Sequence, residues 1–332
     1  MKKFLFFFFL SLAPVYFVLL LLAIFVDPAH IFYKKRLSKH IAYQLVDNRN
    51  TQLPVNFNDR LVAKIVAQKK NNLEILLLGS SRSLQLEHDT FNNDHFYNFS
   101  VNGADVYDYL VIYHLVNKQQ LETVIIGVDP WIFNKNNNEV RYYEYKEELK
   151  QITGTIPVEA HFFHIKELIS PSYLSETPKK MFKSLTDSSI KDSKTKLGDG
   201  SMIYGREERF RSLDRVNSMA EQYIDNGNVY HLNNYDELDT NRKKMFIELI
   251  DDIQKENINV IFLLSPYHPL VYEEIKNSHK LENVENYLLE LADNKEIKVW
   301  GSYNPENVNF TELDFYDGMH PKRESLNKLF IY

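Results

Sequence analysis

The 332-residue sequence contains no cysteine. This absence excludes disulfide bonds, thiolate nucleophiles and cysteine-ligated metal centres. It is compatible with an exported protein, although many intracellular proteins also lack cysteine. Any covalent chemistry must therefore use a nucleophile other than sulfur.

The sequence also lacks an excess of positive charge. It has 39 Lys and Arg against 45 Asp and Glu, which gives a formal net charge of −6 at pH 7. Nucleic-acid binding requires a basic surface and is therefore disfavoured. At this length the chain can bury a sizeable core, as one large domain or as a domain with insertions.

A long hydrophobic run occurs at the N-terminus. The segment Phe4–Val26 is almost wholly apolar and is interrupted only by Ser11 and Pro14. A helix of this length can cross the hydrocarbon core of a bilayer, which is about 30 Å thick. A cleaved signal peptide is the alternative, but the run is longer than its usual apolar region, and no small-x-small cleavage site precedes Asp27. We predict an uncleaved membrane helix at 4–26, preceded by a cytoplasmic tail at 1–3.

Basic residues lie on both sides of this predicted helix. Lys2 and Lys3 favour an N-terminus inside the cell, whereas the basic segment 34–39 favours the opposite orientation or a position against anionic headgroups. Long domains translocate largely regardless of charge. We therefore expect a single-pass protein of the cell membrane, with a juxtamembrane segment at 27–72 and an extracytoplasmic domain at 73–332.

The stretch Leu73–Arg82 has the pattern of a buried strand that ends in a polar turn. Residues 75–78 are all apolar, which is typical of a central parallel strand covered by helices on both faces. Gly79 permits a sharp bend, and Ser81 follows at the carboxyl end of the strand, where open α/β sheets place their ligands. An ordinary Gly-Ser loop is the alternative.

Near the C-terminus, a carboxylate precedes a histidine by three residues. The segment Phe315–Pro321 carries Asp317 and His320 in a loop that also contains glycine and proline. A serine hydroxyl becomes nucleophilic when a base removes its proton, and a carboxylate fixes the tautomer of that base. Ser81, His320 and Asp317 can supply these three roles. A surface turn with a solvated Asp and His is the alternative.

These two motifs resemble the SGNH/GDSL hydrolase superfamily, in which the nucleophile follows the first strand and an Asp-x-x-His lies near the C-terminus. The Gly-Ser-Ser-Arg form at 79–82, one N-terminal membrane helix and the Asp-Gly-Met-His-Pro ending are similar to membrane-anchored proteins of cell-envelope and capsule gene sets. These include bacterial polysaccharide O-acetyltransferases and the teichoic-acid D-alanyl transfer protein. The resemblance covers roughly 73–321 and is specific at its two ends.

The resemblance also implies an oxyanion hole. Gly103 follows the expected second strand, and its N–H, together with that of Ser81, matches the donors of the family; a tight turn is the alternative at Gly103. The chain departs from the family's Gly-x-Asn pattern by carrying Asp129 in the Asn position. An ionised carboxylate cannot donate to an oxyanion. Either the two N–H groups form the hole alone, or Asp129 orients another group such as Arg82.

Further strands and helices alternate along the chain. Strands are expected at 96–101, 123–128, 260–264 and 297–300, and helices at 105–119, after 239 and at 284–291. This alternation predicts an α/β fold: a three-layer, flavodoxin-like (SGNH) parallel sheet with right-handed crossovers. The segment at about 134–205 is an inserted, mostly helical segment over the active-site face.

Three other histidines are candidate functional residues. His161 and His164, with Glu167, have three-residue spacing on an expected helix and can ligate a metal, but a helix flank is the alternative and we expect no metal or cofactor. His268 follows the strand at 260–264, where it is a candidate substrate contact or a rival base to His320.

Two classes of function remain. In the first, Ser81 takes an acyl group from a donor and passes it to a hydroxyl of an envelope or capsular glycan, with a multi-spanning membrane acyltransferase as a possible partner. With water as the acceptor, the same site is an esterase. In the second class, a non-catalytic envelope protein binds glycan or that acyltransferase. The Ser-His-Asp set favours the first class, and Asp129 lends weight to the second.

Overall fold

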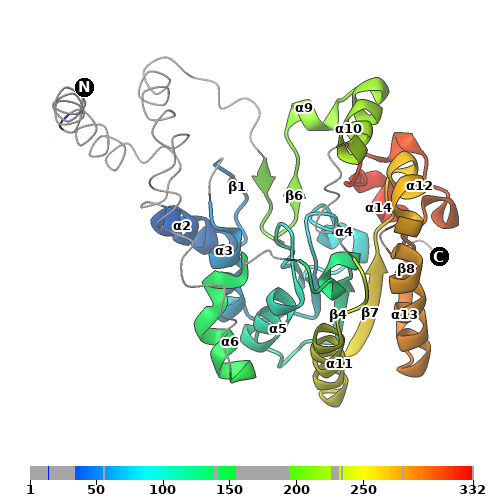
Figure 1. Cartoon of the computed structure of the whole chain (residues 1–332). Helices are drawn as coiled ribbons and strands as arrows, with labels where there is room; N and C mark the ends of the chain where they lie inside the picture. Colours follow the sequence, from blue (N-terminus) through cyan, green and yellow to red (C-terminus); the bar gives the residue numbers. More distant parts are fainter. Residues whose placement is uncertain are drawn as a thin grey trace, which may run out of the picture.

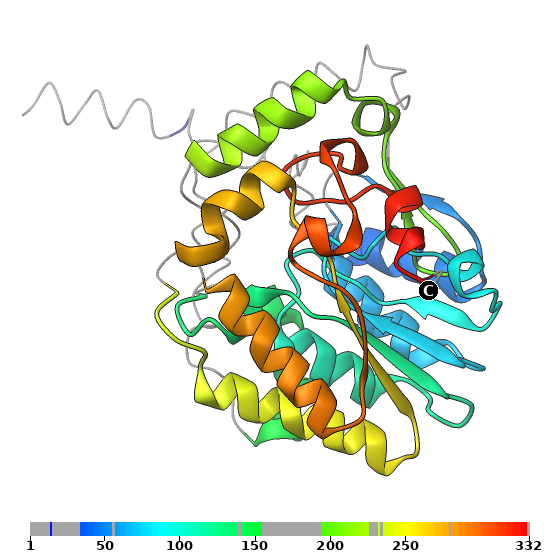
Figure 2. The same cartoon turned by 90° about the vertical axis from the view of Figure 1, so that its right-hand side faces the viewer.

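A parallel five-stranded sheet forms the centre of the computed structural model (Figures 1 and 2). The structure describes residues 14, 34–54, 57–137, 141–154, 194–225, 232, 235–278 and 280–330. In spatial order the strands are β3 (Phe96–Asn98), β2 (Ile75–Leu78), β4 (Thr123–Gly127), β7 (Asn259–Leu264) and β8 (Lys298–Gly301). In chain order this is 2-1-3-4-5, the flavodoxin-like arrangement. The prediction of an α/β fold with a parallel sheet is confirmed.

Both faces of this sheet are buried, which explains why its strands lack polar alternation. Leu76 and Leu78 pack on one face and Leu77 on the other. The first face is covered by α3 (Asp59–Lys69), α5 (Val106–Leu115), α11 (Thr240–Lys255) and α13 (Leu281–Asn294), and the second by α4 (His88–Phe91) and α14 (Arg323–Lys328). The connection from β2 to β3 runs opposite to the later ones, so right-handed crossovers place α4 on the second face.

The remaining elements surround this core. A small antiparallel sheet has the order β1, β5, β6. The elements are α2 (Lys34–Val46), β1 (Thr51–Gln52), η1 (Pro130–Phe133), η2 (Arg141–Tyr145), α6 (Lys146–Thr153), β5 (Thr195–Lys196), β6 (Met202–Ile203), α9 (Arg206–Arg209), α10 (Leu213–Asp225), α12 (Pro269–Ser278), η4 (Pro305–Val308) and η5 (Glu312–Asp314).

The N-terminal part of the described chain belongs to the domain core. Helices α2 and α3 pack on each other, and apolar residues from both join the main hydrophobic cluster. The predicted juxtamembrane segment 27–72 therefore supplies two helices to the domain. The predicted membrane helix 4–26 lies outside the described residues apart from residue 14, and no helix in the described ranges is long and apolar enough to cross a membrane. The candidates His161, His164 and Glu167 also lie outside the described residues.

Two elements end earlier than predicted. The strand expected at 96–101 ends at Asn98, whose side chain binds the carbonyls of Ser83 and Leu86 at 2.9 Å each. The Asn98 side chain thus binds the turn after β2, and beyond it the N–H groups of Phe99 and Val101 still donate to the carbonyls of Leu77 and Gly79. The helix expected at 105–119 ends at Leu115, and the side chain of Asn117 then accepts the N–H of residue 119 in a local turn. Asparagine favours such turns over helix interiors.

Candidate active site

The turn after β2 places Ser81 at the carboxyl edge of the sheet. Gly79 is required there, because a Cβ at this position would lie 2.1 Å from Ser83 Oγ and 3.0 Å from Ser100 Oγ. The chain then closes a turn in which the Ser83 N–H donates to the Ser80 carbonyl at 3.2 Å. Ser81 thus lies where the strand order reverses between β2 and its neighbours, the usual ligand position in such sheets.

His320 connects Ser81 to Asp317. Its Nε2 lies 3.0 Å from Ser81 Oγ, and its Nδ1 lies 3.0 Å from each carboxylate oxygen of Asp317. An ionised carboxylate only accepts hydrogen bonds, so the Nδ1 carries the proton and Nε2 can accept one from Ser81. All three side chains are largely shielded, with His320 12% and Asp317 13% exposed. The structure therefore brings together the three residues that the sequence singled out.

The loop before α14 is folded around the Asp317 carboxylate. Its Oδ1 accepts the backbone N–H groups of Met319 at 2.8 Å and of His320 at 3.0 Å. Burial raises the pKa of this carboxyl, but His320 and the two N–H groups outweigh burial and hold the pKa well below its usual range. The Arg211 guanidinium lies 3.8 Å from Oδ2. Asp317 is therefore ionised at neutral pH.

Arg82, the residue after Ser81, is completely enclosed by the site. Its guanidinium donates to Asp129 Oδ1 at 2.8 Å, to the Met319 carbonyl at 3.3 Å and to the carbonyls of Ser265 and Pro266. Only 1% of its side chain is exposed. Arg82 thus joins the turn after β2 to segments that follow β4 and β7 and to the histidine loop.

Asp129 is paired with Arg82, which is one of the two roles considered for it from the sequence. It follows β4 and is 3% exposed. Burial raises the pKa of its carboxyl, while the Arg82 charge and a hydrogen bond from Ser80 oppose this shift. With its carboxylate held by Arg82, Asp129 supplies no amide donor for an oxyanion.

Two backbone N–H groups remain as candidate oxyanion donors. Within the described part of the chain, the N–H groups of Ser81 and Gly103 donate to no acceptor, although both residues are buried. Buried N–H groups are rarely left without partners. Gly103 has a φ of +55°, and the buried Arg60 holds its carbonyl at 3.2 Å. The N–H groups are therefore free to bind a ligand oxygen.

His268 is not joined to Ser81 by a hydrogen bond. It is fully buried, its Nδ1 accepts the Leu270 N–H at 3.3 Å, and its ring packs against Phe315. Burial lowers the pKa of this imidazole. Among the described residues its Nε2 has no hydrogen-bond partner. The described geometry favours His320 over His268 as the base.

Three residues of the site did not stand out in the sequence. The Tyr204 hydroxyl donates to the Ser81 carbonyl at 3.4 Å, and the Tyr204 ring lies 6.2 Å from the His320 ring. Arg211 binds the loop of Asp317, and Arg60 holds the Gly103 segment. A sequence signal existed for Arg60 alone of these three. The two carboxylates at 105 and 108, at the start of α5, indicate a nearby cation, and Arg60 donates to Asp108 at 2.8 Å.

No protein-family model matches the chain, and no curated protein matches its sequence. Among solved structures, similarity is found to a chain from Bacteroides fragilis that is described as a proposed acylhydrolase. The similarity covers 79% of this chain and 84% of that chain, with 11% sequence identity and a TM-score of 0.36. A likeness this distant carries no argument about the function of this chain.

Proposed function

We propose that the protein is a serine-dependent acyltransferase or esterase of the SGNH type. The observation that carries this proposal is the continuous hydrogen-bonded chain from Asp317 through His320 to Ser81. This is the arrangement that activates a serine hydroxyl for acyl transfer. The unpaired N–H groups of Ser81 and Gly103 support the same reaction, because they can stabilise an oxyanion.

In the proposed reaction, Ser81 Oγ attacks the acyl carbon of the donor while His320 Nε2 takes the hydroxyl proton. The tetrahedral adduct then expels the leaving group, which receives this proton from His320, and an acyl-serine remains. A hydroxyl of the acceptor next gives its proton to His320 and attacks the acyl carbon. The new ester leaves and Ser81 regains its proton. With water as the acceptor, the product is a free acid.

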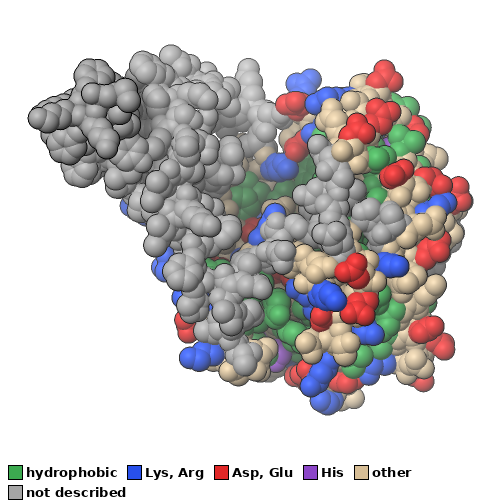
Figure 3. Space-filling model, in the orientation of Figure 1, with side chains coloured by type: hydrophobic (Ala, Val, Ile, Leu, Met, Phe, Trp, Pro, Cys, Tyr) green, Lys and Arg blue, Asp and Glu red, His purple; other side chains and the backbone are tan. Residues whose placement is uncertain are grey.

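We propose a cell-envelope or capsular glycan as the acceptor. An open hollow of about 780 Å³ on α9 and α10 supports this, because its lining includes Arg206, Phe210 and Arg215. Arg211 also lines it and donates to the Tyr316 carbonyl at 3.0 Å, so the hollow adjoins the loop of Asp317. Figure 3 shows basic and acidic side chains interspersed at the top of the molecule, over these helices. Guanidinium donors and an exposed ring suit a hydroxyl-rich polymer.

The test of this function is covalent labelling. A fluorophosphonate should label the purified protein, and Ser81→Ala should abolish the labelling. Labelling that survives the substitution would remove Ser81 from the mechanism. With p-nitrophenyl acetate as donor, glycans should then be compared as acceptors, and Arg206→Gln/Arg215→Gln should lower transfer to glycan without lowering hydrolysis.

We also propose that the domain lies outside the cytoplasmic membrane and is anchored by the helix predicted at 4–26. The apolar run of the sequence supports this location. Protease added to intact protoplasts should digest the domain. Protection until lysis would reverse the orientation and rule out an envelope acceptor.

A non-catalytic glycan-binding protein is the second candidate, because Asp129 stands where the resembled family has an amide donor. Absence of labelling at Ser81, together with glycan binding that Ser81→Ala leaves intact, would favour it.

A further inference from the structure

The hydrogen bonds of Arg82 join several segments of the candidate active site. The roles assigned above do not account for them. Its guanidinium donates to four oxygens on three separate segments, and its central carbon lies 3.9 Å from the centre of the Tyr267 ring. A planar guanidinium with fixed donors suits such a site, whereas a lysine ammonium cannot reproduce its geometry. The Ser80 hydroxyl also accepts the Arg82 N–H at 3.2 Å.

We propose that Arg82 and Asp129 are positioning residues that hold the histidine loop against the nucleophile and balance the charge beside His320. The inference rests on the proposed function and deepens it. It also accounts for the carboxylate in the position where the resembled family has an amide, because Asp129 is the counter-ion of Arg82.

The positioning role follows from where Arg82 and its partner Met319 lie in the sequence. Arg82 directly follows Ser81, and it donates to the carbonyl of Met319, which directly precedes His320. The Arg82 side chain therefore connects the turn that carries Ser81 to the loop that carries His320. A displacement of about 1 Å between reacting groups can cost roughly 10²-fold in rate, so loss of this connection should slow the reaction even if the fold survives.

The charge part follows from what surrounds His320. Asp317 lies on its own loop, Asp129 follows β4 and acts electrostatically on His320, and Arg82 comes from the turn after β2. Other polar neighbours include Arg211, close to Asp317, and the side chains of Tyr204 and Ser81. Asp129 and Arg82 cancel each other at present. Removing one charge leaves the other unbalanced beside the loop of His320.

Three variants separate position from charge. Asp129→Asn keeps the shape but leaves the Arg82 charge unbalanced, which disfavours the imidazolium. Arg82→Lys keeps the charge but loses the fork of donors. The double variant Arg82→Gln/Asp129→Asn removes both charges and the fork. The readout is the pH dependence of kcat/KM for p-nitrophenyl acetate, with a melting curve for each variant.

We expect Asp129→Asn to shift the acid limb of the profile to lower pH by about one unit. Arg82→Lys should keep the limb in place but lower kcat/KM by roughly 10- to 100-fold. The double variant should keep the acid limb at the pH of the parent and have a kcat/KM as low as that of Arg82→Lys. An unmoved limb in Asp129→Asn would overturn the charge part, and full activity in Arg82→Lys would overturn the positioning part.

A second buried ion pair provides a matched control. Arg242 donates to Asp105 at 2.7 Å and to the Ile132 carbonyl at 3.1 Å, and it lies 5.8 Å from the Tyr107 ring centre. Arg242→Gln should lower the melting temperature without changing the limb. An equal shift in this control would mean that any buried ion pair moves the profile, which contradicts the inference.

Failure of this inference is distinct from failure of the proposed function. If Ser81→Ala retains full activity, the function itself is wrong. If Ser81→Ala is inactive while Asp129→Asn and Arg82→Lys both match the parent, the function stands and the positioning role is wrong. Because Asp129→Asn conserves size and hydrogen-bonding shape, its result decides the charge question even where Arg82→Lys does not fold.

Discussion

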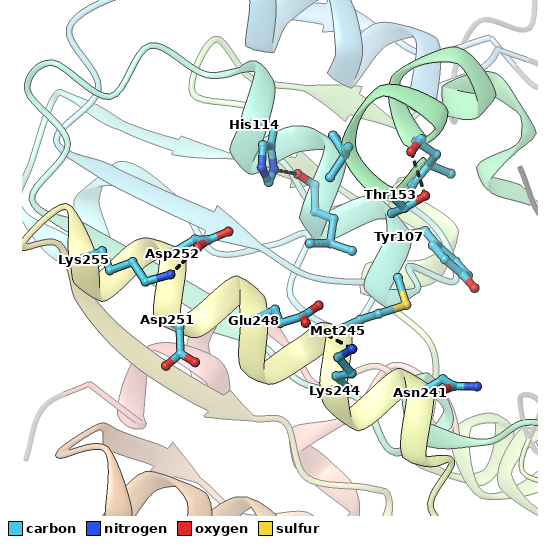
Figure 4. A pocket seen from close by; sticks show the side chains of 13 residues that line it. Tyr107, His114, Thr153, Asn241, Lys244, Met245, Glu248, Asp251, Asp252 and Lys255 are labelled. Carbon is cyan, nitrogen blue, oxygen red and sulfur yellow. Dashed lines mark hydrogen bonds and ion pairs between the residues drawn. The ribbon is translucent and has the colours of Figure 1, made fainter. Parts of the chain in front are cut away.

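The edge of the sheet that carries Ser81 and the groove on the helical face of the sheet differ in how their residues are brought together. The groove, of about 660 Å³, lies between α5, α6 and α11 (Figure 4). Several of its polar groups are bound within one helix: His114 pairs with the Leu110 carbonyl of its own helix, and Lys255 pairs with Asp252 one turn away. At the edge, Ser81 and His320 bond across 239 positions of sequence.

This difference shows that the size of a cavity is a poor guide to chemistry here. The groove has room for a ligand, but several of its polar side chains are already paired: Lys244 with Glu248 and Lys255 with Asp252 on α11, and Asp251 with Lys295 just after α13. At the edge, an ionised carboxylate, an imidazole and a hydroxyl meet in one hydrogen-bonded line. Convergent polar groups with a perturbed pKa mark functional sites better than volume does.

The largest expected effect is the loss of the base. His320→Ala should lower kcat/KM for p-nitrophenyl acetate by about 10⁴-fold or more, because His320 is the base that the described residues place against the Ser81 hydroxyl. His114→Ala in the groove is the control and should remain within twofold of the parent, a margin typical of residues that touch no reacting group. Comparable losses in both variants would erase the distinction between the two regions.

A somewhat smaller loss is expected for Asp317→Asn. The amide keeps the shape but can favour the tautomer whose proton faces Ser81, which blocks the base. Activity should fall by about 10³- to 10⁴-fold. The double variant with His320→Ala should lose little more, because residues that act as one unit are not additive. Losses that multiply would show that another residue orients His320.

Asp317 should also make the stability of the fold sensitive to acid. The folded-state pKa of Asp317 is depressed, so its stabilisation is present above the unfolded value of about 3.9 and is lost as pH falls through the lower folded value. Thermal melts below about pH 4 should therefore fall more steeply for the parent than for Asp317→Asn. Parallel curves would contradict the described hydrogen bonds of Asp317.

The smallest effect is expected in the groove. Lys244 and Glu248 lie 3.7 Å apart on the exposed side of α11. Exposed pairs of this kind contribute about 0.3–0.5 kcal/mol. Lys244→Gln should therefore leave the activity unchanged and the denaturant midpoint nearly so. A large fall in activity would indicate that the groove takes part in catalysis.

Local patterns were enough to predict the central strands. The apolar run 75–78 followed by Gly79 indicated a buried strand and a sharp turn, and both are present. The extent of β3 was not predicted: the regular strand ends at Asn98, whose side chain binds two carbonyls in the turn after β2. Propensity describes the chain locally, whereas such bonds depend on tertiary contacts.

The candidate triad was predicted from the chemistry of two short motifs and from a resemblance, because its residues are far apart in the sequence. Nothing in the residues around Ser81 indicates that His320 lies 3.0 Å away. The contributions of Arg60, Tyr204 and Arg211 were missed for the same reason, since each reaches the site from a segment with no motif of its own. The catalytic roles stay predictions until they are measured.

The central claim is that Ser81 carries the acyl group, and trapping that intermediate tests it most directly. The protein should be mixed with p-nitrophenyl acetate, quenched in acid within the first turnover and digested for mass spectrometry. The account predicts one acetyl group on the peptide that contains Ser81, and none in His320→Ala under the same conditions. Acetyl found only on other residues, or on Ser81 equally in His320→Ala, would contradict it.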